Sequence, residues 1–169
     1  CRGLVESAAE VLPEAQWQRC VVHFYRNVFG HVPASKVREV SHMLKAIHAQ
    51  ETRATAEAKA SSVVDELRRQ RMGRAADLVD AHVAETLTYY AFPDCHWIKI
   101  RTNNPLERIM REIRRRTRVV GAFPDGQSCL NLAAARLRHI AGTQWSTRKY
   151  MNMAPLRAAE TEAYGAATA

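Results

Sequence analysis

Arginines are concentrated in one short segment of this chain, between Lys99 and Arg118. The segment holds eight lysines and arginines and two glutamates, a net charge of +6, whereas the whole 169-residue chain carries +8. Guanidinium groups make forked hydrogen bonds to phosphate oxygens. A dense arginine run therefore indicates a surface that binds a polyanion rather than an ordinary solvated helix face. The segment therefore predicts nucleic-acid binding. Sequence-specific base contacts are not implied, because phosphate contacts alone explain the composition.

Glu107 lies near the start of this segment, and its position allows two interpretations. Asn104 can cap a helix, Pro105 can take the first helical position, and Glu107 then falls at the third. An acid at that position accepts a hydrogen bond from the cap N–H in a capping box. The alternative is metal ligation, because a carboxylate bordered by arginines is what a phosphoryl-transfer site needs to hold Mg²⁺ against DNA.

Helical geometry places Glu107 on the same side of its helix as three arginines. Residues four, three and four positions apart form one row, here Glu107, Arg111, Arg114 and Arg118. The apolar residues of this helix are expected to form a buried stripe beside that row: Leu106, Ile109, Met110 and Ile113. Glu112 faces another side of the helix, where its expected partners are Arg108, Arg115 or Arg116.

Cysteine and histidine offer other candidate ligands, which the spacing disfavours. Cys20 and His23 have a metal-like spacing, and Cys95-His96 could supply two more ligands for zinc. On a strand, however, Cys20 and His23 would point to opposite faces, and adjacent Cys-His is poor chelating geometry. The same geometry argues against a nucleophilic Cys–His pair. The four scattered cysteines instead fit free thiols in a reducing cytoplasm.

The composition predicts a folded, basic protein. Apolar residues make up 47% of the chain and the pI is about 9.7, which favours a packed core and an acidic partner. There is no run of 18 apolar residues and no hydrophobic signal segment, so we expect neither a membrane span nor export. The chain starts at Cys1 rather than methionine, which is more typical of an internal position of a longer protein.

The first part of the chain predicts a helix followed by a strand. Residues 3–12 have helical spacing that ends at Pro13. Residues 17–24 are short, β-branched and aromatic, which is typical of a strand. Because a lone strand cannot satisfy its backbone groups, this assignment requires further strands before Cys1.

The rest of the chain is predicted to be helical. From about Tyr25 to Tyr90 the apolar residues recur at steps of three and four, with Ser35 as an expected N-cap and Gly73 as a helix breaker. A turn is expected around residues 121–126, and the tail is expected to fray. The expected helices cover residues 37–47, 52–71, 78–87, 104–118 and 128–142.

Several motifs together resemble one protein family. In chain order they are Gln18-Arg-Cys-Val-Val-His-Phe-Tyr-Arg-Asn27, Ala91-Phe-Pro93, Trp97, Arg101-Thr-Asn-Asn-Pro-Leu-Glu-Arg108 and Arg111-Glu-Ile-Arg-Arg-Arg-Thr-Arg-Val-Val-Gly121-Ala-Phe-Pro124. From Cys1 to about Tyr150 the chain resembles the C-terminal part of bacterial insertion-sequence transposases of the Mutator-like family, of the Asp-Asp-Glu type.

The resemblance implies a mainly α chain that completes a ribonuclease-H-like α/β core interrupted by an all-helical insertion. Residues 1–24 would end that core with a helix and its last strand, and residues 25–100 would form the insertion. Residues 101–150 would supply C-terminal core helices with the glutamate and the arginine-rich segment. Residues 151–169 would be a flexible tail.

The family's active site implies roles for individual residues. Its Asp-Asp-Glu triad binds two divalent ions, Mg²⁺ or Mn²⁺, and Glu107 matches the catalytic, metal-binding glutamate. The two aspartates belong to segments that precede Cys1, so this chain alone is expected to bind no metal tightly and to be inactive. Further signature positions are Cys20, His23, Trp97 and Asn104. The residues expected to position DNA phosphates are Arg101, Arg108, Arg111, Arg114, Arg115 and Arg118.

Three functions follow as hypotheses. The first is a fragment of a transposase that cleaves a phosphodiester at a transposon end and joins the freed 3′-OH to target DNA. Its expected partners are transposon ends, target DNA, and a second copy or full-length transposase, in the cytoplasm on the nucleoid and away from membranes. The alternatives are a non-catalytic DNA-binding or transposase-interfering remnant, and a basic helical interaction protein with no DNA role.

Overall fold

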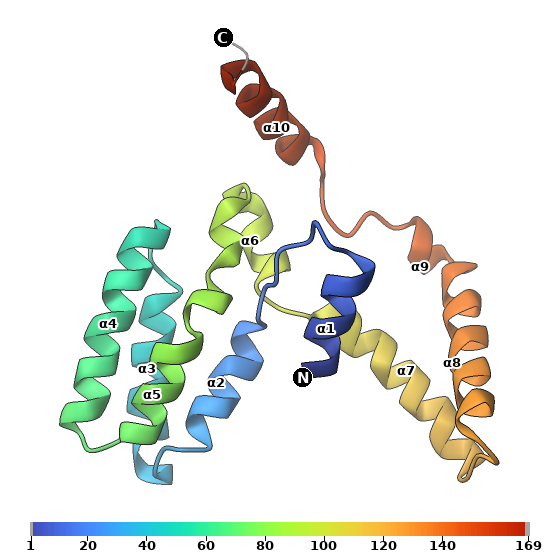
Figure 1. Ribbon diagram of the computed structural model, residues 1–169, viewed down its shortest axis with the longest axis horizontal. Coiled ribbons are helices and arrows are strands. Elements are labelled where there is room, and N and C mark those ends of the chain that lie inside the picture. The colour runs from blue at the N-terminus through green and yellow to red at the C-terminus, as the bar shows by residue number, and fades with distance from the viewer. Residues whose placement is uncertain (1, 168–169) are drawn as a thin grey trace. The chain divides into compact units, whose positions relative to one another are not determined.

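The computed structural model describes residues 2–167, which form two compact units that meet in sequence between Thr102 and Asn103. Both units are helical, and the described residues contain no strand (Figure 1). The prediction of a mainly α chain is therefore confirmed. The ribonuclease-H-like core stays an expectation that this helical structure does not test.

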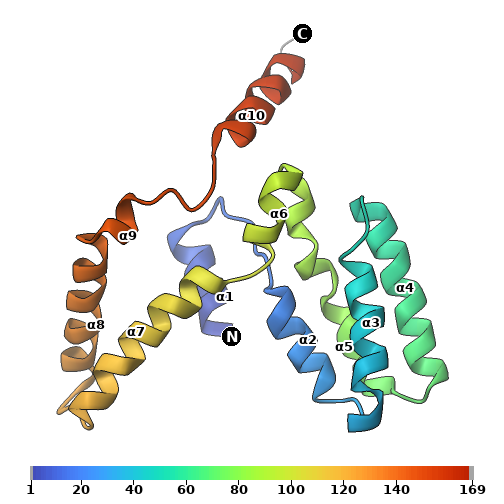
Figure 2. The same ribbon diagram turned by 180° about the vertical axis from the view of Figure 1, so that it is seen from behind.

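Helices α2 to α5 of the first unit lie side by side around one hydrophobic core (Figures 1 and 2). Their fully buried side chains include Phe24, Leu44 and Leu67. Helix α2 spans the expected boundary between residues 24 and 25. The helices of this unit are α1 (Arg2–Val11), α2 (Val21–Phe29), α3 (Val37–Ile47), α4 (Arg53–Arg69), α5 (Gly73–His82) and α6 (Asp94–Ile100), with short 3₁₀ turns at Ala34–Lys36, Ala84–Thr86 and Thr88–Ala91.

The strand predicted over residues 17–24 is wrong, because a helix begins inside it. Cys20 has extended backbone angles, φ −62° and ψ 121°, and α2 starts at the next residue. Val21, Phe24 and Val28 are all buried at steps of three and four, which is helical spacing. A short run of β-branched and aromatic residues cannot be assigned to strand or helix by its pattern alone, and packing against the other helices decided the outcome.

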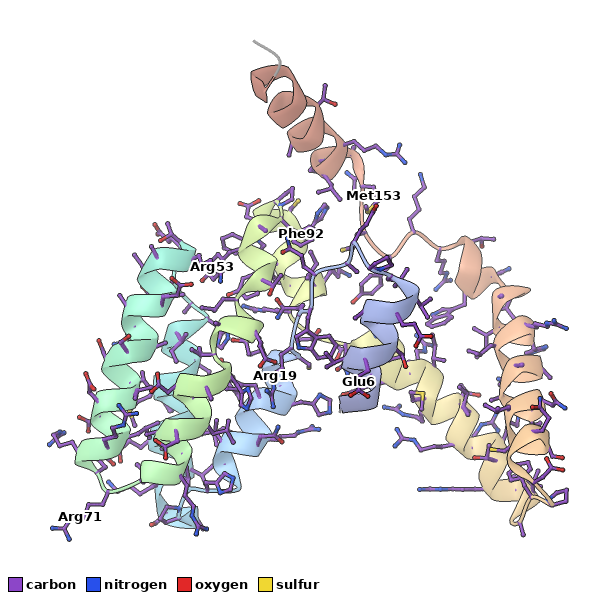
Figure 3. All side chains as sticks on the ribbon, in the orientation of Figure 1. Glu6, Arg19, Arg53, Arg71, Phe92 and Met153 are labelled. Carbon is purple, nitrogen blue, oxygen red and sulfur yellow. The ribbon has the colours of Figure 1, made fainter. Side chains whose placement is uncertain are left out.

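The side chain of Gln18 fixes the extended segment that precedes α2. Its Nε2 donates to Thr86 O at 3.0 Å, and its Oε1 accepts from Tyr89 N at 2.8 Å. Arg19 N donates to Glu85 O at 2.8 Å beside it (Arg19 is labelled in Figure 3). The start of the Gln18–Asn27 motif therefore attaches this segment to the 3₁₀ turns that follow α5.

A Schellman turn connects α4 to α5. Arg71 has a φ of 60°, and its N–H donates to Arg68 O at 2.9 Å while Met72 N–H donates to Leu67 O at 2.9 Å. Leu67 and Met72 are both buried, which is the apolar contact typical of this motif. Arg71 extends from the turn into solvent (Figure 3). Gly73, expected to break a helix, is instead the first residue of α5.

Helix capping in the first unit differs from the sequence expectation in one place. Thr52 caps α4 by accepting from Thr55 N at 3.2 Å, and the Thr55 hydroxyl accepts from Thr52 N at 3.3 Å. Ser35, the expected cap of α3, lies instead within the 3₁₀ turn, and α3 begins after Lys36 without a side-chain cap.

His48 is buried at the end of α3 in a hydrogen-bonded network. The Thr86 hydroxyl donates to Val83 O at 2.6 Å, so we assign the proton of the imidazole to Nε2, which donates to Thr86 Oγ1 at 2.8 Å. Nδ1 is then unprotonated and lies 2.9 Å from the Tyr25 hydroxyl, which also donates to Leu44 O at 3.0 Å. Burial lowers the pKa of His48 from 6.5 to about 4, so the ring is neutral at physiological pH.

Acid is expected to destabilise the first unit through His48. Below pH 6.5 the unfolded chain takes up a proton that the folded chain accepts only near pH 4, so stability falls as the pH drops through this window. The loss attributable to this ring is about 3 kcal/mol over the whole window. Urea unfolding between pH 7 and pH 4 measures the free energy of unfolding, which should depend less on pH in His48→Gln than in the original protein. His42→Gln, at an exposed histidine of α3, serves as the control; identical slopes for the two variants would contradict the assignment.

Helices α7 (Asn104–Val120) and α8 (Gly126–Ala141) of the second unit form an antiparallel hairpin. Gly121, with φ 78°, ends α7, and Asp125 caps α8 by accepting from Ser128 N at 2.6 Å. A single turn, α9 (Gln144–Thr147), follows, and the segment expected to fray contains α10 (Ala154–Ala167). None of the described helices in either unit is long and apolar enough to span a membrane.

The buried stripe predicted along α7 is wrong, because no described residue of α7 or α8 is fully buried. Ile109 and Ile113 are half-buried, but Leu106 and Met110 remain 39% and 42% exposed. A two-helix hairpin can cover only one side of each helix, so an apolar arc of this width extends beyond its partner.

Candidate nucleic-acid interface

The N-cap of α7 lies one residue before the cap that the sequence predicts. Asn103 is the N-cap, Asn104 is the first helical residue, and Glu107 N–H makes the first helical bond, 3.0 Å to Asn103 O. Glu107 therefore sits one position too far along for the predicted capping box, and the Asn103 side chain makes no cap hydrogen bond. The capping box proposed around Asn104 is wrong, and Glu107 remains half-buried in the first turn.

Four arginines of α7 line a single concavity of about 410 Å³: Arg111, Arg114, Arg115 and Arg118. All four side chains are exposed. Three arginines of the predicted row thus share this space, Arg115 joins them from the adjacent position, and Glu107 of the same row is not among the lining residues. Arg114 Nε is fixed by donating to Met110 O at 3.2 Å. A group of guanidinium ions on one helix face has the charge and the donors to bind several phosphates of one polyanion.

Glu112 connects this concavity to α8. Its Oε2 accepts from Arg115 Nη2 at 3.2 Å and from Arg136 Nη2 at 2.8 Å. The hydrogen bond from Arg136, followed by that from Arg115, lowers the pKa of the Glu112 carboxyl, which therefore stays ionised. Glu112 orients Arg115 and ties α7 to α8. The spacing along the helix predicted Arg115 as a candidate partner of Glu112. It did not indicate Arg136, which is 24 residues away from Glu112.

The two remaining predicted phosphate ligands lie elsewhere. The Arg108 guanidinium lies over the Trp145 ring, 5.8 Å from its centroid. Arg101 belongs to the first unit, where its Nη1 donates to His48 O at 3.4 Å and its carbonyl accepts from Val21 N at 3.0 Å. The structure thus brings together four of the six arginines named from the sequence, and it gives Arg101 and Arg108 protein contacts of their own.

The signature residues Cys20 and His23 flank the start of α2. Cys20 ends the extended segment, and His23 lies in the first turn of the helix. Because both residues lie at the start of a helix, they do not point to opposite faces of a strand. Cys20, Cys95 and Cys129 are free thiols, as expected, and Cys1 lies outside the described residues.

Trp97, the third signature residue, supports the core of the first unit. Its Nε1 donates to Phe92 O at 2.7 Å. Its ring packs edge-on against Tyr90, 4.7 Å between centroids, and against Tyr89 at 5.6 Å. Aromatic pairs in this geometry stabilise a core beyond their buried area. The fourth signature residue, Asn104, is exposed at the start of α7.

A metal site cannot be assembled from the residues that the structure describes. They contain no group of three or more His, Cys, Asp or Glu side chains that could hold an ion, and this holds for zinc around Cys20 and His23 as well. Glu107 is a single carboxylate, whereas two divalent ions about 4 Å apart need several. The residues present do not fit a complete two-metal centre.

Comparison with known sequences shows the family. Residues 1–147 match the family described as Transposase, Mutator family, and the chain belongs to it. It is 35% identical over 155 residues to the transposase for insertion sequence element ISRM5 of Rhizobium meliloti, covering 92% of this chain. It is 36% identical over 155 residues to the transposase for IS406 of Burkholderia multivorans, covering 90% of this chain.

The chain corresponds to only part of these relatives. It spans 39% of the length of both transposases, and the same share of the transposase for IS256 in transposon Tn4001 of Staphylococcus aureus, to which it is 28% identical over 154 residues. No solved structure matches the chain.

Proposed function

We propose that this chain is the C-terminal region of a DNA transposase and that the arginine concavity of α7 binds the phosphate backbone of DNA. The observation that carries the proposal is the gathering of Arg111, Arg114, Arg115 and Arg118 around one space. Membership of the Mutator family of transposases supports DNA as the polyanion. The transposition reaction, cleavage at a transposon end followed by strand transfer, is proposed for the protein that contains the complete active site.

Glu107 is our proposed contribution to that active site. It lies on α7 one turn before Arg111, and this spacing supports a carboxylate close to the proposed phosphate-binding surface. A bound Mg²⁺ or Mn²⁺ would stabilise negative charge on the reacting phosphate. The described residues supply no further ligand set, so carboxylates from outside them would have to complete the centre.

The protein's partners follow from the same proposal. Transposon ends and target DNA would both use the backbone contacts, because guanidinium–phosphate bonds are independent of sequence. A second copy of the chain or a full-length transposase would be the protein partner when two transposon ends are joined, and a DNA-bound protein of this kind would be associated with the nucleoid.

Salt dependence of DNA binding tests the proposal. Four phosphate contacts predict that log K falls with log salt with a slope of about −3.6, because each neutralised phosphate releases condensed counterions. Fluorescence anisotropy of a labelled duplex between 50 and 300 mM NaCl measures this slope. Weak binding that is nearly independent of salt would overturn the proposal and favour a basic interaction protein with no DNA role.

A further inference from the structure

A second concavity, between α7, α8 and α9, differs chemically from the arginine concavity. It has a volume of about 220 Å³ and lies wholly within the second unit. Its walls combine an indole, two aliphatic side chains, three basic groups, one carboxylate and one threonine: Trp145, Ile109, Ile140, Arg108, Arg136, His139, Glu112 and Thr143. A space of this size cannot admit a helix or a duplex, but it can admit one planar heterocycle.

Two planar groups of this pocket lie over one another. Trp145 is half-buried, and the Arg108 guanidinium covers its ring at 5.8 Å from the centroid. Nucleobases stack both on aromatic rings and on guanidinium planes, and they do so whatever their sequence because every base has a π face. Because the guanidinium already lies over this face, a base that enters would displace it and stack on the indole in its place.

Arg136 supplies the polar group of the pocket. Its side chain is only 17% exposed, and its Nη2 is committed to Glu112 at 2.8 Å. Its Nε is buried and has no hydrogen-bond partner within the described part of the chain. Because a buried donor without an acceptor is unfavourable, a ligand with a ring nitrogen or carbonyl acceptor would satisfy it.

The pocket and the arginine concavity share a helix and an ion-pair network. Arg108 of the pocket precedes Arg111 of the concavity by three residues on α7, and Glu112 bonds both to Arg115 and to Arg136. The pocket and the arginine concavity therefore lie about one helical turn apart on α7. We propose that this pocket holds a single unstacked nucleobase of bound DNA, with Trp145 as the stacking surface and Arg136 Nε as a donor to the base. The inference rests on the proposed DNA-binding function.

The DNA side of the contact provides the test. A labelled duplex with a one-nucleotide bulge is compared by anisotropy with the same duplex carrying an abasic bulge, which keeps the phosphates and removes only the base. The protein should bind the duplex with the bulged base about tenfold more tightly than the abasic duplex, in line with the stacking of one base on an aromatic side chain. Because both duplexes carry the same charge, the ratio should not change with salt.

Variants then locate the contact. Trp145→Ala should bring the affinity ratio to one, and Trp145→Phe, which keeps an aromatic face, should retain part of it. Leu130→Ala changes an exposed residue of α8 that does not line the pocket, so the ratio should stay at its original value. Quenching of 2-aminopurine placed in the bulge reports stacking directly, and circular dichroism establishes that the helices of each variant are intact.

The outcomes separate the two proposals. Steep salt-dependent duplex binding with a base-to-abasic ratio of one in the original protein overturns the base pocket and leaves the phosphate site standing. A ratio that survives Trp145→Ala in a folded variant also overturns it, because the base would then be held elsewhere. Failure to bind any DNA overturns the proposed function itself.

Discussion

Replacing the four arginines of the α7 concavity by glutamine should lower the affinity for duplex DNA by about 100- to 1,000-fold at 100 mM salt. The changes are Arg111→Gln, Arg114→Gln, Arg115→Gln and Arg118→Gln. Each contact contributes up to about one decade of affinity at this salt through counterion release, so the salt slope should also fall by about 3 to 4. Anisotropy titrations at several salt concentrations measure both quantities on one labelled duplex.

A charge-matched variant shows whether position matters. Four exposed basic residues of the first unit, changed together to glutamine, remove the same formal charge and leave α7 untouched: Arg38, Lys45, Arg71 and Arg74. This control variant should retain most of the salt dependence of DNA binding that the original protein has. Equal losses in the two variants would mean that net charge attracts DNA to the whole surface, and the assignment of the concavity would then be wrong.

Glu107→Gln should abolish metal-dependent strand cleavage while leaving DNA binding intact. The experiment requires a protein that carries the family's two aspartates as well as these residues, assayed on a plasmid with the transposon ends. An amide keeps the size of the side chain but is a much poorer ligand for Mg²⁺, so we expect cleavage to fall by at least about 1,000-fold. Removing a negative charge beside the arginines should leave affinity for DNA unchanged or slightly higher.

The structure makes the Glu107 experiment easier to interpret. Because the capping box around Asn104 does not form, loss of a cap would not be the explanation for an inactive variant. Thermal unfolding provides the check, because it distinguishes an unfolded variant from a folded variant that has lost activity. Cleavage at a rate near that of the original protein would remove Glu107 from the proposed active site.

Elements with long and regular apolar periodicity were predictable from the sequence. The helices near residues 37–47 and 52–71 occur almost as expected, because residues three and four apart share a face whatever the surrounding fold. The short segment at 17–24 was not predictable, since its run of β-branched and aromatic residues satisfies strand and helix patterns equally well. Only the packing of Phe24 and Val28 in a helical core distinguishes them.

Some features of the candidate site were likewise predictable from the sequence, whereas others depend on the tertiary structure. The amino-acid order by itself determined that α7 is strongly cationic and that Arg111, Arg114 and Arg118 share a side with Glu107, because helix geometry is local. Tertiary structure alone decided which arginines remain available. Trp145 and Arg136 come from elements far along the chain, and their contacts engage Arg108 and Glu112. Pairing between distant residues leaves no periodic signal, since it depends on how helices meet rather than on how each is built.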